Sequence, residues 1–246
     1  LSHCEKLGVP VIEDAAHSLG TTWRGKNIGT FGRLGCFSFQ SYKLLNSGEG
    51  GMLITDDPDC FAKAVVMSGA YEHNWKKHHG ERQFFEKWQN QLPLYNMRLN
   101  NLSALIVDSQ IPYLDERIEN GRRNHDIAAK KLNHSEWIHV PEKFEHEARA
   151  PDSIQFNLVG LTPLEVSQFC DLINRMGVAL QVFGNSKDNA RAFWNWDFLP
   201  ERFNLPKTRG MLMNACDVRL PARLNVDDCK SIAEMILEAL RQVKSN

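Results

Sequence analysis

The stretch of sequence that decides the fold is residues 9–51, which read VPVIEDAAHSLGTTWRGKNIGTFGRLGCFSFQSYKLLNSGEGG. It opens with a short apolar run, Val9 to Ile12, that ends in two acidic residues. This pattern predicts a parallel strand that is buried on both faces and carries polar groups at its carboxyl end. In open α/β sheets, ligands bind at that edge. The eight glycines from residue 20 to residue 51 predict short strands and tight turns with little helix.

After this stretch, the pattern indicates a helix, an irregular insertion and a second helical segment. The first helix begins after Asp56-Asp57-Pro58, where two acids and a proline mark its first turn. Residues 71–94 are rich in His, Lys and Trp and have no clean period, so we interpret them as a long, lid-like insertion. Residues 101–132 are expected to form a long helix or a helix pair with a bend at Pro112.

From about Glu136 onward, strand-like pieces alternate with helices, which indicates a second, smaller α/β domain. The expected strands are 137–140, 153–159 and 178–183, and the expected helices are 163–176 and 227–243. We therefore expect residues 1–115 to form part of a large domain and residues 116–246 to form a small C-terminal domain.

The composition argues against several classes of partner. The 29 basic and 30 acidic residues nearly cancel, so no global charge attracts nucleic acid or an anionic membrane. The longest apolar runs fall short of the roughly 20 residues that a membrane span needs. The six cysteines include no C-x-x-C pair, which argues against a zinc site and a disulfide framework and favours a reduced, cytoplasmic setting.

The N-terminus of the chain has neither an initiator methionine nor a signal peptide. Its first residues have the pattern of a helix end, with Gly8 as the C-cap, that runs straight into a strand. We therefore expect the chain to be the C-terminal part of a longer protein, whose preceding portion adds strands to the same sheet.

Four side chains in the first stretch are of types that can hold an aldehyde cofactor. A lysine in a desolvated pocket, such as Lys43, can form an imine with the aldehyde, although a solvated lysine in a turn is the more common case. Asp14 can pair with a protonated ring nitrogen or can act as a helix N-cap. His17 can reach a ring oxygen or can be a satisfied buried histidine. Ser38 can bind a phosphate or can simply lie on a strand.

Four pieces of the stretch follow one another in a distinctive order and spacing: EDAAHSLG at 13–20, GTFGRLGCFSF at 29–39, Lys43, and GEGG at 48–51. Together they resemble the core signature of the DegT/DnrJ/StrS-type sugar aminotransferases, which use pyridoxal 5'-phosphate (PLP). The resemblance implies a fold type I, aspartate-aminotransferase-like α/β fold, present here as a partial large domain plus a smaller C-terminal α/β domain. It also implies roles for four residues: Asp14 as the partner of the pyridinium nitrogen, His17 beside the ring, Ser38 as a phosphate ligand and Lys43 as the Schiff-base lysine.

The resemblance continues through LYNMRLNN at 94–101, which is similar to the family's Gly-Tyr-Asn-x-Arg-Leu segment. It implies that Asn96 reaches across a dimer interface to the partner's cofactor phosphate, and that Arg98 makes a nearby anion or structural contact. The alternative for both residues is hydrogen bonding within a loop. Two departures leave the keto substrate open: Leu44 follows the lysine where Asn is common, and Arg223 stands where the family often presents a histidine near the substrate.

The implied reaction is a ping-pong transamination by a homodimer with shared active sites. It moves the amino group of glutamate or glutamine to a ketone on a sugar or a related small molecule, and Lys43 transfers the proton. One alternative is a PLP-dependent sugar dehydratase of the same family, which lacks the lysine. Another is a non-catalytic relative or fragment that binds or regulates a partner.

Two further clusters are open to more than one interpretation. His73, His78 and His79 have no second ligand pair at metal spacing, so we interpret them as part of a solvated loop and expect no metal. An aromatic cluster either walls a substrate pocket or packs the small domain. Its members are Phe193, Trp194, Trp196 and Phe198.

Overall fold

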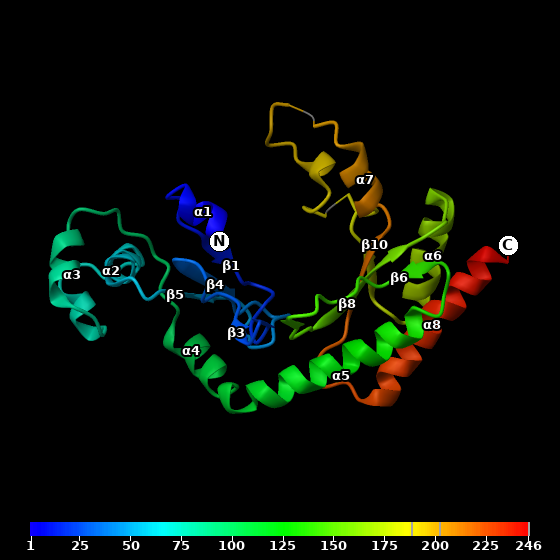
Figure 1. The fold of residues 1–246 in the computed structure, drawn as a ribbon, viewed down its shortest axis with the longest axis horizontal. Helices are drawn as coiled ribbons and strands as arrows, with labels where there is room; N and C mark the ends of the chain where they lie inside the picture. Colours follow the sequence, from blue (N-terminus) through cyan, green and yellow to red (C-terminus); the bar gives the residue numbers. More distant parts are fainter. Residues whose placement is uncertain (188, 202, 246) are drawn as a thin grey trace. The chain divides into compact units, whose positions relative to one another are not determined.

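The computed structural model describes residues 1–187, 189–201 and 203–245, and these form two compact units (Figure 1). The first unit consists of residues 1–115 together with residues 145–150, and the second contains residues 116–144 and the chain from residue 151 onward. The segment 145–150 therefore belongs to the first unit, although it lies within the part of the sequence expected to form the small domain. No described helix combines the length and the apolarity needed to cross a membrane.

A three-stranded sheet with the order β1-β4-β5 organises the first unit. Strand β1 (Ile12–Asp14) runs parallel to β4 (Leu34–Ser38), with Asp14 opposite Cys36, whereas β5 (Gly51–Ile54) runs antiparallel to β4. The prediction that the strand ending in two acidic residues is a parallel one is confirmed by its pairing with β4. The expectation of short strands and turns with little helix is also confirmed over this stretch.

The prediction that this first strand is buried on both faces is wrong. Strand β1 begins at Ile12 and not at Val9, and these two side chains are 62% and 52% exposed. Ile12 and Asp14 are exposed on one face of β1 and Glu13 is half-buried on the other, so the described residues cover only the Glu13 face, and only in part.

The short helix α1 (Ser2–Lys6) precedes β1 and ends as the sequence predicted. Gly8 has a φ of +66°, and its N–H donates to the carbonyl of Glu5 while the Val9 N–H donates to that of Cys4. This pair of bonds is the Schellman arrangement, in which a glycine in the left-handed region satisfies the last carbonyls of a helix.

A second small sheet in the first unit has the order β3-β2-β7. All three of its strands are two residues long: β2 (Thr22–Trp23), β3 (Lys26–Asn27) and β7 (Glu147–Ala148). The hydroxyl of Thr21 accepts from the N–H of Ala150, and this bond holds the end of the segment 145–150 in the first unit.

The insertion at residues 71–94 contains regular structure although its sequence has no clean period. It contains the 3₁₀ turn η1 (Asn74–Lys77) and helix α3 (Arg82–Trp88), and it packs on helix α2 (Pro58–Met67). Trp75 stacks on Phe85 with the ring centroids 5.2 Å apart, and both side chains are buried against α2. The sequence showed no period because a few aromatic contacts, and not a continuous apolar stripe, hold this segment.

The expected bend in the next helical segment is confirmed. Helix α4 (Asn101–Asp108) is separated from helix α5 (Leu114–Leu132) by the 3₁₀ turn η2 (Ile111–Tyr113), which contains Pro112. Proline cannot donate to the preceding turn of a helix, so the helix ends or bends at this position.

The second unit contains a four-stranded antiparallel sheet with the order β6-β8-β10-β9. Its strands are β6 (Ile138–His139), β8 (Ser153–Leu158), β9 (Leu180–Val182) and β10 (Ala215–Arg219). The sequence predicted the segments of the first three strands but missed β10, which pairs with both β8 and β9 inside the sheet. It also missed the short helix α7 (Pro206–Leu212).

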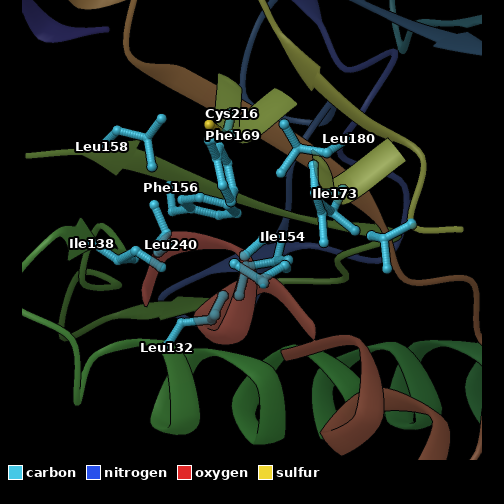
Figure 2. Close-up of a cluster of buried hydrophobic side chains, with 14 of the residues drawn as sticks. Leu132, Ile138, Ile154, Phe156, Leu158, Phe169, Ile173, Leu180, Cys216 and Leu240 are labelled. Atoms are coloured by element: carbon cyan, nitrogen blue, oxygen red, sulfur yellow. The ribbon is translucent and has the colours of Figure 1, made fainter. Parts of the chain in front are cut away.

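One face of this sheet forms the largest core of the protein. Alternate residues of β8, namely Ile154, Phe156 and Leu158, are buried against α5, α6 (Pro163–Arg175) and α8 (Val226–Lys244) (Figure 2). The alternation follows from the two-residue period of a strand. The two predicted helices begin at capping boxes, with Thr162 and Asn225 as the N-caps.

Removing a large side chain from this core should destabilise the protein far more than the same truncation at the surface. Phe156 is 1% exposed, whereas Phe198 in the same unit is 77% exposed. We expect Phe156→Ala to lower the free energy of unfolding by about 3–5 kcal/mol and Phe198→Ala to change it by less than about 0.5 kcal/mol. Urea unfolding of both variants checks this, and equal midpoints would contradict it.

Candidate active site

The parallel strands β1 and β4 bring two of the predicted site residues to the same edge of the sheet. Asp14 is the last residue of β1 and lies opposite Cys36, and Ser38 ends β4 two residues further along. Because parallel strands end on the same side, the Asp14 carboxylate and the Ser38 hydroxyl start from neighbouring positions at one edge. The turn that follows β4 carries Lys43 five residues after Ser38.

Local hydrogen bonds orient the two strand ends. The carboxylate of Asp14 accepts from the N–H of Ala16 at 3.1 Å, in the turn that also contains His17. No helix follows β1, so the N-cap alternative for Asp14 does not apply. His17 is exposed, so the alternative of a buried, satisfied histidine is also wrong. The hydroxyl of Ser38 accepts from the N–H of Gln40 at 3.3 Å, and as a hydroxyl it still has a proton to donate.

Hydrogen bonds close the turn that carries Lys43, and a buried leucine anchors it. The Lys43 N–H donates to the carbonyl of Gln40 at 2.9 Å, and the Lys43 carbonyl accepts from the side chain of Asn46 at 3.2 Å. Leu45 is buried in a cluster with Phe39. Lys43 itself is half-buried.

A glutamine that the sequence analysis did not identify fastens this turn to the helical segment. The side chain of Gln110, just after α4, donates to the carbonyl of Asn46 at 2.6 Å and accepts from its N–H at 3.4 Å. The two residues are 64 positions apart, so no local pattern pointed to this contact. The reciprocal pair limits how far the Lys43 turn can move from the end of α4.

Asn96 and Arg98 lie on an extended segment that continues from the insertion. The N–H groups of Tyr95 and Met97 donate to carbonyls at the end of α2, so Asn96 between them is held in place and is exposed. The guanidinium of Arg98 lies 5.8 Å from the ring centroid of Tyr71. This is a cation–π contact within the first unit.

Arg223 belongs to the second unit, where it is exposed in the turn between β10 and α8. Helix α5 fixes this turn, because the carbonyl of Leu224 accepts from Arg123 at 2.9 Å and from Asn124 at 3.2 Å. Asn124 is fully buried, and its side chain also donates to the carbonyl of Pro221.

Three members of the aromatic cluster, all but Phe198, line a pocket of about 330 Å³ in the second unit. Trp194 and Trp196 form part of its wall together with Glu201 and Arg209, and the guanidinium of Arg209 lies 4.4 Å from the Trp194 ring centroid. These tryptophans are half-buried, which favours the pocket-wall interpretation over core packing.

In the insertion, the three histidines are exposed, and no described group of three His, Cys, Asp or Glu residues is arranged to hold a metal.

Glu13, the neighbour of Asp14, is bound by three backbone donors and was not identified from the sequence. It accepts from the backbone N–H of Gly29 at 2.8 Å and from those of Phe31 and Gly32 at 2.6 Å each. Burial raises the pKa of Glu13, but the three N–H donors outweigh this effect, so the pKa lies below its ordinary value of 4.5. The sequence contained a signal for this contact, because the glycine-rich loop at 28–33 has backbone N–H groups that need an acceptor.

Comparison with protein families gives one match over nearly the whole chain. The model of the DegT/DnrJ/EryC1/StrS aminotransferase family matches residues 1–237. The matched region contains every residue of the candidate site, from Asp14 to Arg223.

Curated relatives are similar over part of their length. The chain is 35% identical over 189 residues to the 3-amino-5-hydroxybenzoate synthase of Amycolatopsis mediterranei (strain S699), covering 76% of this chain and 47% of that protein. It is 29% identical over 197 residues to the GDP-perosamine synthase of Vibrio cholerae, covering 80% of this chain and 48% of that protein. The chain thus spans about half of the length of these relatives.

Solved structures share the fold at low sequence identity. The aminotransferase TlmJ from Streptoalloteichus hindustanus superposes with a TM-score of 0.80 at 18% identity, covering 98% of this chain and 61% of that one. The GDP-4-keto-6-deoxy-D-mannose-3-dehydratase of E. coli, solved with bound hydrated PLP, superposes with a TM-score of 0.74 at 22% identity, covering 95% of this chain and 62% of that one. These likenesses confirm the expected fold type I α/β architecture.

The edge that carries Asp14 and Ser38 depends on a close backbone approach at Gly35. A Cβ added there would lie 2.0 Å from the carbonyl oxygen of Gly29, whereas one added at Gly210 in α7 would meet nothing within 4 Å. We expect Gly35→Ala to destabilise the protein by about 1–3 kcal/mol and Gly210→Ala to be neutral or slightly stabilising. Thermal unfolding measures both changes, and a Gly35→Ala protein as stable as the wild type would contradict the packing.

Proposed function

Because the chain belongs to the DegT/DnrJ/EryC1/StrS aminotransferase family, we propose that it acts in a PLP-dependent aminotransferase with Lys43 as the Schiff-base lysine. The enzyme moves the amino group of glutamate or glutamine to a keto-sugar or a related ketone. The observation that carries the proposal is the parallel pairing of β1 with β4. It brings Asp14 and Ser38 to the same edge of the sheet, directly before the turn that carries Lys43.

The chemical types at this edge fit the polar groups of PLP. A carboxylate matches a protonated ring nitrogen, a hydroxyl matches a phosphate oxygen, and a lysine amine matches an aldehyde. In this proposal Asp14 would pair with the ring nitrogen and keep it protonated, and the Ser38 hydroxyl would donate a hydrogen bond to the phosphate. When bound, PLP supplies the electron sink that the reaction needs.

The remaining side chains take supporting roles in the proposal. Lys43 would move the proton between the α carbon of the amino donor and the C4′ position. His17 lies three residues after Asp14 and would contact the ring or its phenolic oxygen. Arg98 and Arg223 are the proposed substrate-binding cations, since a guanidinium pairs well with carboxylate and phosphate groups.

The alternatives differ in what they require of Lys43. A sugar dehydratase shares the fold, as the E. coli structure illustrates, but the dehydratase pattern lacks this lysine. A non-catalytic binding protein would not need a lysine held half-buried in a fastened turn. The presence of Lys43 therefore favours the aminotransferase. We propose small molecules as its substrates and, because the cysteines include no C-x-x-C pair, the cytoplasm as its location.

We further propose a homodimer with shared active sites, to which Asn96 contributes. Asn96 is exposed and rigidly placed, and the neighbouring segment exposes many large apolar side chains that water solvates poorly. These side chains are Leu94, Tyr95, Met97, Leu102, Leu105 and Ile106. A second copy of the chain would cover them and receive Asn96 near its own phosphate site.

Substitution of the lysine tests the assignment of the cofactor. We expect Lys43→Ala to abolish turnover and the borohydride-fixable absorbance band near the visible edge, while the fold is kept because the side chain lies outside the cores. Asp14→Ala should keep the band and lose most of the rate, since an unprotonated ring is a poor electron sink. The exposed Lys77→Ala variant serves as the control. Peptide mapping that finds the fixed cofactor on another lysine would contradict the proposal.

Mixing two inactive variants tests the shared site. If Asn96 serves the partner's site, a heterodimer of Asn96→Ala and Lys43→Ala chains contains one site with both changes and one site with neither. We therefore expect turnover to reappear when the two proteins are mixed and allowed to exchange subunits. Failure to recover activity although heterodimers form, or full activity of a monomer at high dilution, would contradict a composite site.

A further inference from the structure

Glu13 and Asp14 are neighbours on β1, so their side chains leave the strand on opposite faces. Asp14 therefore faces one side of the strand end, and Glu13 reaches to the other side and binds a loop. That loop, residues 28–33, connects β3 to β4 and sets where β4 begins. Glu13 is thus placed to control the second strand of the site without lying in the site itself.

The loop is pressed against both strands, so its position and theirs are linked. The Arg33 N–H donates to the carbonyl of Val11 at 2.8 Å, directly before β1. A Cβ added at Gly32 would lie 2.6 Å from that same carbonyl oxygen, and one added at Gly29 would lie 2.5 Å from the ring of Phe37 in β4. A Cβ added at Gly35 in β4 would lie 2.0 Å from the Gly29 carbonyl oxygen, so the backbone of the loop lies close against β4 and the positions of the two are coupled.

The loop presents three backbone donors to one carboxylate, and an ionised carboxylate is the side chain best suited to accept them. It offers acceptor positions on both oxygens and no donor, and bonds to a charged acceptor are stronger than neutral ones. A glutamine of the same size would turn an NH₂ group toward N–H donors and lose the charge.

From this geometry we infer that Glu13 is a positioning residue of the cofactor site. By holding the N–H groups of Gly29, Phe31 and Gly32, it fixes the start of β4 against β1 and so sets the distance between Asp14 and Ser38. The inference rests on the proposed function, because it assigns these two side chains to one bound PLP.

The experiment compares Glu13→Gln, Glu13→Asp and a matched control, Glu86→Gln, which removes the charge of an exposed carboxylate paired with Arg82 in α3. Amide hydrogen exchange of peptides covering residues 28–33 reports on the loop, and titration with PLP reports on the site. For Glu13→Gln we expect faster exchange in the loop and a dissociation constant for PLP raised at least tenfold, which is about 1.4 kcal/mol. Glu13→Asp keeps the charge and should recover part of the affinity, and Glu86→Gln should match the wild type in both measurements.

The outcomes separate this inference from the proposed function. A wild-type protein that forms the borohydride-fixable band at Lys43, together with a Glu13→Gln protein of unchanged PLP affinity, overturns the role of Glu13 alone. A wild-type protein that forms no such band overturns the proposed function and the role of Glu13 with it. If Glu13→Gln does not fold, Glu13→Asp decides the matter: a shifted PLP affinity with intact thermal unfolding supports positioning, and an unchanged affinity overturns it.

Discussion

The parallel pairing of β1 with β4 is the constraint on which the rest of the first unit depends. It places Asp14 opposite Cys36, and the strand direction then carries Ser38 and the Lys43 turn to the same edge. Beside this pairing, the backbone of Gly29 in the loop before β4 lies close against Gly35, which has no Cβ and so leaves room for it. The positions of the polar groups at this edge thus follow from the strand direction and from the missing side chain at Gly35.

Three contacts between distant parts of the sequence hold that edge in one arrangement. Glu13 accepts hydrogen bonds from the loop that precedes β4, and Gln110 donates one to the turn that follows β4. Leu45 anchors the same turn in a small buried cluster. Each contact limits one end of β4. A site held from both sides loses little conformational freedom when it binds a ligand, which is the physical meaning of preorganisation.

The second unit obtains its stability differently. Its antiparallel sheet buries one face against three helices, and two of these helices start at capping boxes that satisfy their first backbone donors. Lys244 near the end of α8 bonds to Glu165 in the first turn of α6, which holds the pKa of Glu165 at about 2. The unit presents Arg223 and the Trp194 pocket from turns and loops attached to this core, where side chains can vary without disturbing the packing.

The sequence by itself determined the elements whose causes are local. Glycine and proline positions, capping residues and strand alternation depend on neighbours a few residues away, and they predicted the bend at Pro112, the end of α1 at Gly8 and the segments of α6 and α8. The motif order also identified the family, while the roles of Lys43 and its neighbours stay predictions. Only the tertiary structure decided the exposure of β1, the docking of the insertion through Trp75 and Phe85, the central strand β10, and the partners of Glu13 and Gln110. These depend on which distant backbone groups need an acceptor and which surfaces are left uncovered, and that information arises only when the chain packs.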